Sequence, residues 1–456
     1  MNNPSRRTFL AGSALAALGY GVSSPAQSKS AQSNTATPWV NWSGELSCQP
    51  AGRFSPASTE ELQSVLAATK SKIRPVGSGH SFSPLVPTDG HLVVLDRLTG
   101  LLDHDKASQQ ATFAAGTRLA DMGAPLADIG QAMLNLPDID RQTLAGATAT
   151  ATHGTGIDFT CLSAFITGLK LVTPTGELLE LRQGDELFAA AQVSVGALGV
   201  ITEMTLQNRD PYRLKALNTV ERIEDVLATF NERAAAHRHF EMFPLTHSNY
   251  ALVLTIDETD EPINNPPPSP EEEAGFAQAM AYWATLPPSE RMPLIDELAE
   301  QIGPSSAVDE SYRILSNIRN NRFNEMEYSV PKEAGAECLR EVLATIIEQE
   351  VDVVFPLEYR YVKRDDTWLS MSAGEYDHAA ISIHRTAGED FRPYFDLIEP
   401  IFWKYEGRPH WGKIHSLGAQ KLKALYPRFT DFQEVREMLD PDGRMLNPHL
   451  SHLFVG

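Results

Sequence analysis

Residues 74–83 read RPVGSGHSFS, a short apolar strand that runs into a turn with two glycines. Gly77 and Gly79 are one residue apart, and glycine adopts positive φ without a steric penalty, so the backbone N–H groups of such a turn can converge on a pyrophosphate. The stretch is not a Rossmann fingerprint, because the third glycine is absent and no helix of the expected kind follows. Taken alone, it is compatible with an ordinary tight turn as well as with an anion site.

A second stretch, residues 145–156, has almost only small side chains and reads AGATATATHGTG. A core strand would favour Val, Ile and Leu, so we predict here a strand of Ala, Gly and Thr whose backbone approaches a flat ligand closely. A tightly packed strand or helix crossing is the alternative. A third stretch, residues 196–201, reads GALGVI and enters a β-rich run over residues 200–206.

The order of these three stretches resembles the FAD domain of the vanillyl-alcohol-oxidase type. The resemblance implies an α+β flavoprotein of two domains, an FAD-binding domain of the PCMH type and an α+β substrate (cap) domain. In that family the first turn and the small-residue run cradle the pyrophosphate and flank the flavin, and the third stretch adds backbone contacts. The FAD-binding residues implied in this way are Pro75, Val76, Gly77, Ser78, Gly79, His80, Ser81, Phe82, Pro137, Ala145, Gly146, Thr150, Thr152, His153, Gly154, Gly199, Val200 and Ile201.

His80 is the residue through which the resemblance implies covalent FAD. Sugar-lactone oxidases and alditol oxidases of this family bond a histidine in the Gly-x-Gly-His-Ser turn to the 8-methyl carbon of the flavin. An imidazole suits this bond, because one neutral ring nitrogen is nucleophilic while the other is held by a hydrogen bond. A histidine that only caps the turn around non-covalent FAD is the alternative. The spacing of His153, His410 and His415 indicates no metal site.

The second half of the chain resembles the sugar-lactone oxidases as well, so the match runs nearly from Trp39 to the end. The stretches that carry it are Asn324–Tyr328, Leu357–Arg360, Asp366–Ser370, Arg408–His415 and Asp440–Pro448.

Glu358 and Arg360 stand two apart in a predicted strand, so both side chains point to the same face. Such a pair suits a polyol, because the carboxylate accepts from hydroxyl groups and the guanidinium donates to a ring or carbonyl oxygen. Burial of either charge alone would be costly. A purely structural ion pair is the alternative.

Lys413 is the first candidate for catalysis. In the resembling enzymes the positions of Glu358, Arg360 and Lys413 line the substrate pocket that faces the flavin, and His384 falls on a nearby strand. Oxidation of an alcohol moves a hydride to the flavin while the hydroxyl loses its proton, so a cation or base at that oxygen stabilises the developing charge. A counter-charge for the reduced flavin and an ordinary surface lysine are the alternatives.

Pro137 bears on the electron acceptor. In the resembling family a small residue over the flavin controls the reaction with oxygen; alanine there accompanies dehydrogenases, and glycine or proline accompanies oxidases. Pro137 stands at that position and favours an oxidase. The next residue, Asp138, stands where alditol oxidases have serine, which argues against an alditol substrate.

Residues 39–210 are expected to form the FAD-binding domain and residues 211–456 the substrate domain, with a Pro-rich insert over 257–273 and a C-terminal segment, 405–456, that returns to the flavin. Apolar periodicity predicts helices over 59–70, 221–236 and 331–348. It predicts strands over 73–76, 92–95, 110–114, 169–172, 200–206, 250–256, 353–361 and 379–384.

The net charge of −21 argues against nucleic acid or anionic lipid as a partner and favours a neutral polar substrate. Residues 5–10 read SRRTFL and precede a short apolar run, which predicts a twin-arginine signal peptide over 1–26, a polar linker over 27–38, and a periplasmic or secreted protein. An amino-terminal anchor or a chance basic pair is the alternative, although the apolar run falls short of the about 20 residues that span a bilayer. The three cysteines are widely spaced and indicate no disulfide framework.

The leading interpretation is FAD-dependent oxidation of a hydroxyl group of an aldono-1,4-lactone, such as D-arabinono- or L-gulono-1,4-lactone, with oxygen as the acceptor. An alditol oxidase and a lactone dehydrogenase that uses a cytochrome or quinone are the alternatives. A secreted flavin-binding protein without catalysis is a further alternative, against which the presence of Lys413 and Glu358 argues. The expected partners are therefore a small polyol or lactone and an electron acceptor, with the export machinery only in transit.

Overall fold

The computed structural model describes residues 37–267, 278, 282–299, 302–317 and 321–456. The predicted signal peptide, nearly all of the predicted linker and the last part of the Pro-rich insert lie outside these residues. Among the helices that are described, none combines the length and apolar character needed to cross a bilayer.

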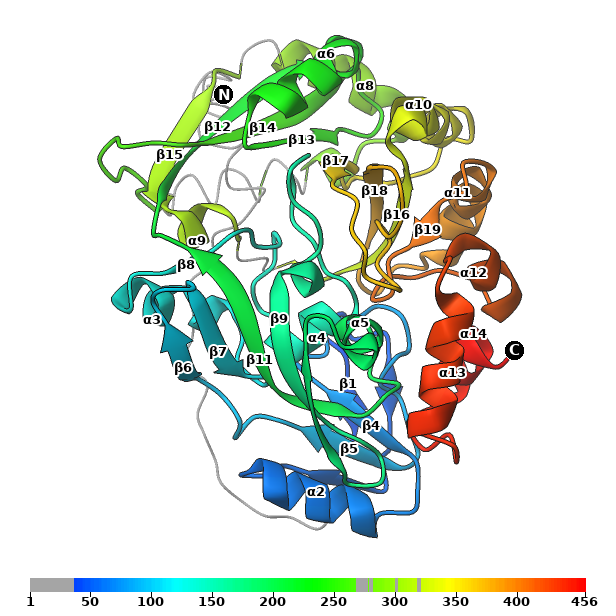
Figure 1. Ribbon diagram of the computed structural model, residues 1–456. Helices are drawn as coiled ribbons and strands as arrows, with labels where there is room; N and C mark the ends of the chain where they lie inside the picture. The colour runs from blue at the N-terminus through cyan, green and yellow to red at the C-terminus, as the bar shows by residue number, and fades with distance from the viewer. Residues whose placement is uncertain (1–36, 268–277, 279–281, 300–301, 318–320) are drawn as a thin grey trace.

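The N-terminal region, residues 39–209, is built on three sheets (Figure 1, lower half). A parallel sheet has the order β3-β5-β4, a larger antiparallel sheet has the order β10-β9-β11-β7-β6 with β8 added to β11, and β1 pairs with β2. The strands are β1 (Trp39–Val40), β2 (Ser47–Cys48), β3 (Gly52–Phe54), β4 (Ile73–Val76), β5 (His91–Val94), β6 (Leu101–Asp105), β7 (Gln110–Ala114), β8 (Ala132–Met133), β9 (Ile166–Val172), β10 (Leu178–Arg182) and β11 (Val200–Arg209). The helices are α2 (Thr59–Ala68), α3 (Gly123–Asp128), α4 (Leu144–Ala149) and α5 (Glu186–Gln192), with 3-10 turns at Leu119–Asp121 and Leu162–Phe165.

Local sequence signals placed most of these elements correctly. The strands predicted over 73–76 and 110–114 coincide with β4 and β7, and those over 169–172 and 200–206 lie within β9 and β11. The helix predicted from Thr59 is α2, and its N-cap is Ser58, whose hydroxyl accepts a hydrogen bond from the Glu61 backbone N–H.

The strand predicted within residues 145–156 is wrong, because the first part of this run is helix α4. Thr143 supplies the N-cap: its hydroxyl accepts from the Gly146 backbone N–H at 3.2 Å. Alanine has the highest helix propensity of any residue, and a capped start is sufficient for this short helix. The expected close packing of backbone is present, but around a helix rather than along a strand.

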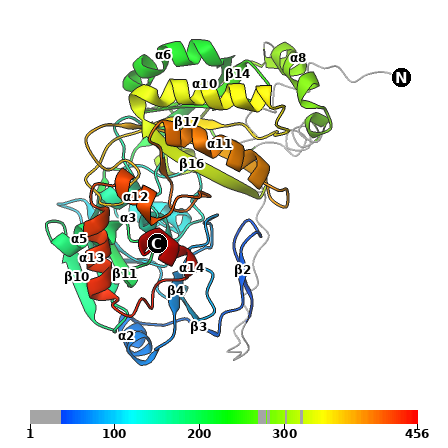
Figure 2. The same ribbon diagram turned by 90° about the vertical axis from the view of Figure 1, so that its right-hand side faces the viewer.

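The second region is an eight-stranded sheet in the order β15-β12-β14-β13-β17-β18-β16-β19. Its strands are β12 (Arg213–Arg222), β13 (His239–Pro244), β14 (Tyr250–Glu258), β15 (Ser305–Glu310), β16 (Phe323–Pro331), β17 (Glu358–Val362), β18 (His378–Thr386) and β19 (Arg408–Pro409). Its helices are α6 (Ile223–Ala236), α8 (Pro288–Ala299), α9 (Ser311–Ile314), α10 (Lys332–Glu348) and α11 (Arg392–Lys404). Figures 1 and 2 show α6, α10 and α11 on the outer side of this sheet, with the N-terminal region beyond its other side.

The strand predicted over 353–361 is correct only in its last part, since β17 begins at Glu358. Pro356 has no backbone N–H and cannot donate to a sheet ladder, which favours irregular backbone before this point. The Leu357 N–H instead donates to the Pro244 carbonyl at 2.9 Å. Glu358 and Arg360 are the first and third residues of this strand, and its far end contacts the N-terminal region, where the Gly156 N–H donates to the Tyr361 carbonyl at 3.1 Å.

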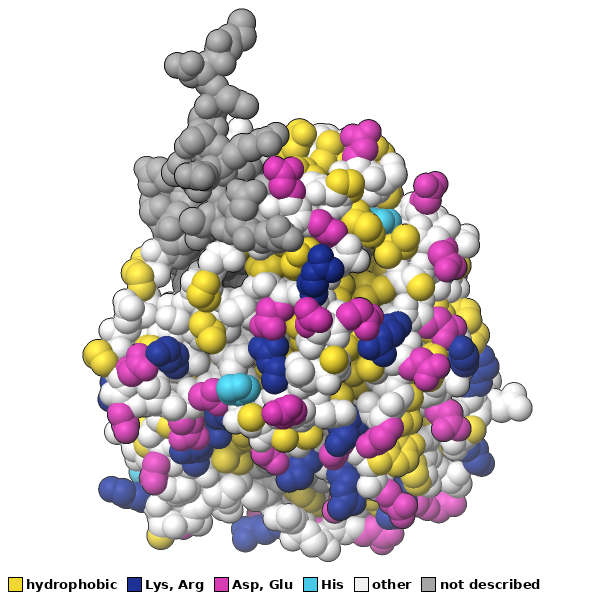
Figure 3. All heavy atoms as spheres, turned by 90° about the horizontal axis from the view of Figure 1, so that it is seen from above, with side chains coloured by type: hydrophobic (Ala, Val, Ile, Leu, Met, Phe, Trp, Pro, Cys, Tyr) yellow, Lys and Arg dark blue, Asp and Glu magenta, His cyan; other side chains and the backbone are white. Residues whose placement is uncertain are grey.

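The C-terminal helices α12 (Ala419–Leu425), α13 (Phe429–Leu439) and α14 (Pro448–Phe454) lie along the N-terminal region, with α13 near α5 (Figure 2). The buried Arg74 guanidinium donates to the carbonyls of Gly196 and Met445, and so joins β4 to the chain before α14. On the face seen in Figure 3, acidic and basic side chains are interspersed and form no patch of a single sign.

Candidate active site

The stretches proposed as a flavin cradle lie against one another. A Cβ atom on Gly77 would stand 2.1 Å from the Thr143 hydroxyl at the start of α4, and one on Gly196 would stand 2.9 Å from the Pro75 ring. Gly79 has a φ of +71°, which a residue with a side chain rarely adopts. The turn after β4, the start of α4 and the segment before β11 therefore form one continuous surface, on which glycine is required.

The residues of this surface fit the pyrophosphate of FAD. The Ser78 hydroxyl is buried and has no hydrogen-bond partner within the described chain, although buried hydroxyls normally have one. The residues on both sides of Ser78 are glycines, which have no side chain that could block a ligand. The turn over Pro75–Phe82 thus lies against the start of α4, which includes Ala145 and Gly146, and contact of these residues with FAD stays a proposal.

Other residues predicted to bind FAD have partners inside the protein. The Thr150 hydroxyl donates to the Gly146 carbonyl at 3.2 Å, and the Thr152 hydroxyl donates to Gln142 at 3.0 Å. Gly199 packs on β9, where its Cβ would meet the Val172 carbonyl at 2.4 Å, and the two residues that follow it, Val200 and Ile201, are buried in β11. The structure gives these five residues partners within the protein, with FAD contact left as a proposal.

His80 is held beside Trp42, with ring centroids 5.1 Å apart and nearly parallel planes. Burial first, and then the positive charges of Lys413, Arg118 and Arg141, lower the pKa of His80 to about 4. The imidazole is therefore neutral at neutral pH and keeps a free lone pair on one ring nitrogen.

The turn that carries His80 is joined directly to the segment that carries Lys413. The Phe82 N–H donates to the Gly412 carbonyl at 2.7 Å, and the Ser83 hydroxyl donates to the Trp411 carbonyl at 2.6 Å. The Lys413 ammonium lies 5.2 Å from the centre of the Phe82 ring. The candidate cofactor and substrate residues therefore belong to a single site.

On the substrate side, Glu358 and Arg360 lie side by side on β17, as their spacing predicts, with Arg360 Nη1 2.8 Å from Glu358 Oε1. Lys413 pairs with Glu325 of β16, and His384 Nε2 of β18 lies 3.6 Å from the same carboxylate. Three neighbouring strands and the loop after β19 thus direct these five charged or polar side chains to one place.

Glu325 and Glu327 are central residues that the prediction missed. Glu327 is almost fully buried. Its carboxylate accepts hydrogen bonds from His153 Nε2 at 2.7 Å, from the Ser382 hydroxyl at 2.9 Å and from Arg360 Nη2 at 3.3 Å. A usable signal was present, because two glutamates two apart in a strand face the same side, and both need partners if that side is buried.

The charged groups of the site strongly shift one another's pKa values. Burial would raise the pKa of Glu325, but Lys413 and His384 outweigh it and lower this pKa to about 2. Burial would likewise raise the pKa of Glu327, yet His153, His410 and Arg360 hold it well below its usual value.

The pKa values of two further carboxyl groups are raised rather than lowered. Burial raises the pKa of Glu358 despite Arg360, and burial together with the charge of Glu358 raises the pKa of Glu241 on β13 to about 7. These two carboxyl groups therefore keep a proton to a higher pH than an exposed carboxyl group does.

Ligand atoms of Glu325, Glu358 and His384 lie within 4.8 Å of one another, a spacing that a cation could use. Lys413 and Arg360 already neutralise the two carboxylates. Ion pairing accounts for this cluster, and polar groups held in this way suit the hydroxyl groups of a sugar.

Pro137 and Asp138 approach the site from the N-terminal region. The chain after α9 holds them: the Ser316 hydroxyl donates to the Pro137 carbonyl at 2.7 Å, and the Asn317 side-chain amide donates to Asp138 Oδ1 at 2.8 Å.

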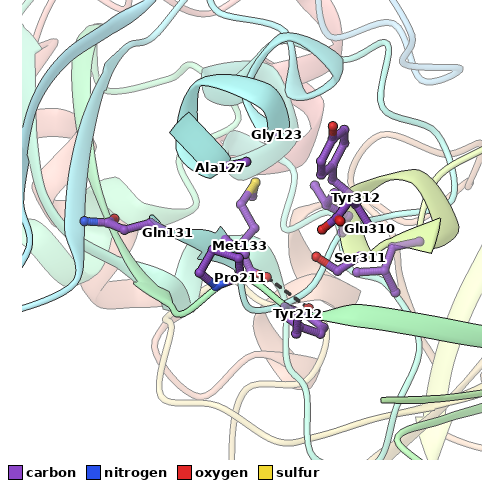
Figure 4. Close-up of a pocket in the computed structure, with 12 residues that line it drawn as sticks. Gly123, Ala127, Gln131, Met133, Pro211, Tyr212, Glu310, Ser311 and Tyr312 are labelled. Atoms are coloured by element: carbon purple, nitrogen blue, oxygen red, sulfur yellow. Dashed lines mark hydrogen bonds between the residues drawn. The ribbon is translucent and has the colours of Figure 1, made fainter. Parts of the chain in front are cut away.

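A separate small pocket lies between α3, β8 and α9 (Figure 4). Its wall includes the Tyr212 ring, whose hydroxyl donates to the Met133 carbonyl at 3.1 Å. None of the predicted site residues lines it, and it lacks the charged cluster, so it is not the candidate substrate site.

Comparison with known proteins supports both the fold and the cofactor. Residues 50–182 match a family model described as an FAD binding domain. A solved cholesterol oxidase variant from Brevibacterium sterolicum superposes with a TM-score of 0.74 at 15% identity, covering 91% of this chain and 96% of that one. The chain is an FAD-dependent oxidoreductase with the two-domain vanillyl-alcohol-oxidase fold.

Residues 204–453 match the family model described as D-arabinono-1,4-lactone oxidase, and the chain belongs to this sugar-lactone oxidoreductase family. L-gulono-1,4-lactone dehydrogenase of Mycobacterium tuberculosis is 36% identical over 422 residues, which cover 90% of this chain and 97% of that protein. L-gulonolactone oxidase of Bos taurus is 29% identical (91% and 97% covered), and alditol oxidase of a Streptomyces species is 27% identical (91% and 99% covered).

Proposed function

We propose that this enzyme oxidises a hydroxyl group of an aldono-1,4-lactone of the D-arabinono or L-gulono type and passes the electrons to oxygen. The observation that carries the proposal is the pairing of Lys413 with Glu325 beside the Glu358–Arg360 pair, together with the hydrogen bond from the turn of His80 to the loop that carries Lys413. Relatives named as lactone oxidases and dehydrogenases support the substrate class.

In this proposal Lys413 acts at the reacting hydroxyl. Bound FAD supplies the acceptor for the hydride that leaves the substrate carbon. The Lys413 ammonium stabilises the negative charge that develops on the oxygen as its proton leaves, and Glu325 fixes the ammonium in place. The imidazole of His384, on the other side of Glu325, completes the polar wall around that oxygen.

Glu358 and Arg360 bind the rest of the substrate. The carboxylate accepts from ring hydroxyl groups, and the guanidinium donates to the lactone oxygens. Because Arg360 is also held by Glu327, its planar group is already oriented before substrate arrives, which reduces the entropy lost on binding.

His80 is the proposed point of covalent attachment. Its neutral ring, held against Trp42, suits nucleophilic attack on the activated flavin methyl group.

Oxygen is the favoured acceptor because proline stands at position 137. A second candidate is a lactone dehydrogenase that reduces a cytochrome or quinone, and the 36% identical mycobacterial relative named as a dehydrogenase favours it. An alditol oxidase is the weaker alternative, because the substrate pocket carries Asp138.

The reaction is tested by adding lactones and alditols to the purified, FAD-loaded enzyme without oxygen and following the flavin absorbance. We expect one or more 1,4-lactones to bleach it and alditols to do so far more slowly. Air or a c-type cytochrome is then admitted to separate the two acceptors. Bleaching by alditols alone would contradict the proposed substrate, and reoxidation only by the cytochrome would contradict the proposed acceptor.

Comparison with the Pro137→Ala variant isolates the contribution of this residue to oxygen use. We expect slower reoxidation by air and an unchanged rate with an artificial acceptor. An unchanged rate of reoxidation by air would show that Pro137 does not control the reaction with oxygen.

We also propose export by the twin-arginine route to the periplasm or the outside of the cell. The motif at Arg6 and Arg7 supports it, and a folded export route suits a protein that takes up FAD before it leaves the cytoplasm. Lysine at both positions should retain the protein in the cytoplasm, as measured by cell fractionation. Equal export of this variant would exclude the route.

A further inference from the structure

Glu241 on β13 points to the same side of the sheet as Arg360. The two residues are Cα partners in the pairing of β13 with β17, and directly paired residues of two strands share a face. Glu241 Oε2 lies 4.0 Å from Arg360 Nη1 and also accepts a hydrogen bond from the Thr155 hydroxyl. The other oxygen, Oε1, makes no hydrogen bond to a described residue.

The exposed fractions of the side chains place Glu241 at the wall of the substrate pocket. The Glu241 side chain is 10% exposed, close to the 9% of Glu358 and the 8% of Arg360, whereas Glu327 is 1% exposed. Glu241 therefore has the same access to a bound molecule as the two residues that are proposed to bind the substrate.

Glu241 and Glu358 share one cation. Glu358 Oε1 lies 2.8 Å from Arg360 Nη1, the nitrogen that also faces Glu241, and Arg360 Nη2 is directed to Glu327 instead. Within the described chain, no other Lys or Arg forms an ion pair with Glu241 or Glu358. When two carboxyl groups share a site in this way, one of them keeps its proton, and the longer ion contact assigns that proton to Glu241.

The pKa of Glu241 agrees with this assignment. Burial first, and then the charge of Glu358, raise it to about 7, while Arg360 and the Thr155 hydroxyl act against them. Because Thr155 occupies Oε2, the proton on Oε1 is available to a ligand.

We propose that Glu241 is a substrate-binding residue that works in its protonated form and donates a hydrogen bond from Oε1 to the carbonyl oxygen of the lactone. This inference rests on the proposed lactone oxidation. A carbonyl oxygen only accepts hydrogen bonds, so it is bound by a donor and repelled by a carboxylate. Glu241 thus adds a neutral donor beside Arg360, and the Glu358 carboxylate remains the acceptor for the hydroxyl groups.

The donor is lost when Glu241 ionises, so we expect KM for the lactone to rise about tenfold from pH 6 to pH 8, with a smaller change in kcat. The other titratable or charged groups that face Glu241 are Glu358 and Arg360 of β17, Asp138 of the loop before α4, and His239 on its own strand. Arg360 stays charged in this range, and His239 stays neutral because burial lowers its pKa to about 4. The titration belongs to the Glu241–Glu358 pair, and substitutions assign it.

Two substitutions at this position separate the donor from the charge. Glu241→Gln keeps a donor and an oxygen that accepts from Thr155 but cannot ionise, so KM should stay low from pH 6 to pH 8. Glu241→Met removes the donor, so KM should be about tenfold higher at both pH values. Glu258→Gln, an exposed carboxyl group on the neighbouring strand β14, is the control and should reproduce the wild-type profile.

A ligand without the carbonyl group tests which oxygen Glu241 binds. The 1,4-anhydroalditol that corresponds to the lactone keeps the ring and its hydroxyl groups but lacks the carbonyl oxygen. Its affinity is measured by competition with the lactone. Glu241→Met should lower this affinity by less than about threefold, against about tenfold for the lactone.

Infrared difference spectra of the FAD-loaded enzyme between pH 6 and pH 8 report the proton without turnover. We expect a protonated-carboxyl band that disappears as the pH rises and that Glu241→Gln lacks, because Glu358 then has Arg360 to itself. Persistence of the band in this variant, or of the wild-type KM profile, would overturn the inference. So would an equal loss of affinity for lactone and anhydroalditol in Glu241→Met, which would make the residue structural. Failure of the proposed function is distinct, because then no lactone would bleach the wild-type flavin, whatever the infrared spectra show.

Discussion

At the scale of single residues, Lys413 offers the sharpest test of the chemistry. Lys413→Met removes the cation while keeping the length of the side chain, so we expect flavin reduction by lactone to slow about 100-fold to 10,000-fold with a much smaller change in substrate affinity. Rapid anaerobic mixing measures both quantities. Lys423→Met, on the exposed side of α12, is the matched control. An equal loss of rate and affinity would assign Lys413 to substrate positioning.

His80 is tested separately from turnover. His80→Ala removes the only nucleophile that we propose for flavin attachment, so the acid-precipitated protein should lose all of its bound yellow colour. Gel fluorescence of the denatured protein measures this. A fluorescent band that persists in the variant would place the bond on another residue.

In the proposed mechanism Glu327 is a positioning residue, because it contacts both Arg360 and His153. Removal of one partner from a buried ion pair costs about 3–5 kcal/mol, and Glu327→Gln should lower the free energy of unfolding by that order. We also expect KM to rise about tenfold with a smaller change in kcat, since Arg360 loses its orientation.

Steady-state kinetics and denaturant unfolding together check the role of Glu327. Asp440→Asn, another buried carboxylate that accepts the backbone N–H groups of Arg444 and Met445, is the control. It should lose stability without a change in KM. If Glu327→Gln shows the same pattern as this control, its role is structural only.

At the scale of elements, the contact between the turn after β4 and the N-terminus of α4 shapes the cofactor surface. Gly77→Ala should push the Thr143 side chain from its capping position, because the new methyl group would stand 2.1 Å from that hydroxyl. Overpacking of this kind costs about 1–3 kcal/mol, and loss of the cap costs about 1 kcal/mol. We expect weaker FAD retention and a lower melting temperature.

The clash hypothesis predicts that Gly77→Ala and Thr143→Ala together cost less than the sum of the two single changes. Gly303→Ala, with no atom within 4 Å of the added carbon, is the control. Melting of the flavin-loaded proteins with flavin fluorescence measures all four variants. Strict additivity would mean that the glycine is required for its backbone alone.

At the scale of the whole molecule, buried histidines predict acid lability. Burial, as the leading cause, lowers the pKa of His239 to about 4 and that of His378 and His410 to about 3. The unfolded chain binds protons at these residues below about pH 6.5 and the folded chain does not, so stability is complete above that pH and falls as the pH falls toward 4 and 3. Each histidine contributes up to about 1.4 kcal/mol per pH unit.

Glu241, whose pKa burial and Glu358 raise to about 7, and Glu358, whose pKa burial raises, act in the opposite direction, but they are two groups against the three histidines. Thermal unfolding of the FAD-loaded enzyme between pH 4.5 and 8 checks the sign, and His378→Gln should reduce the slope on the acid side. A melting temperature that is constant from pH 7 to 4.5 would contradict the prediction.

Elements whose signals are local were predictable. The two-residue period of a strand placed Glu358 and Arg360 on one face, and the Gly-x-Gly turn after β4 indicated an anion site, because both depend on neighbours within a few residues. The helix–strand error in residues 145–156 arose where the signal was ambiguous, since Ala, Gly and Thr form tight packing in either conformation and only the Thr143 cap distinguishes them.

The pairings that make the site were decided by tertiary structure. Glu327 and His153 are 174 residues apart in sequence, and Lys413 and Glu325 are 88 apart. The first pairing depends on how the two domains dock, and the second depends on how the loop after β19 packs on β16. No local pattern encodes which buried cation meets which carboxylate. The order of three short stretches indicated the flavin fold through a family resemblance, and strand periodicity indicated the charged face of β17. The carboxylates around Arg360 meet only when strands distant in sequence pair in one sheet, and Asp138 is held only where the two domains meet, because these contacts join segments far apart in the chain.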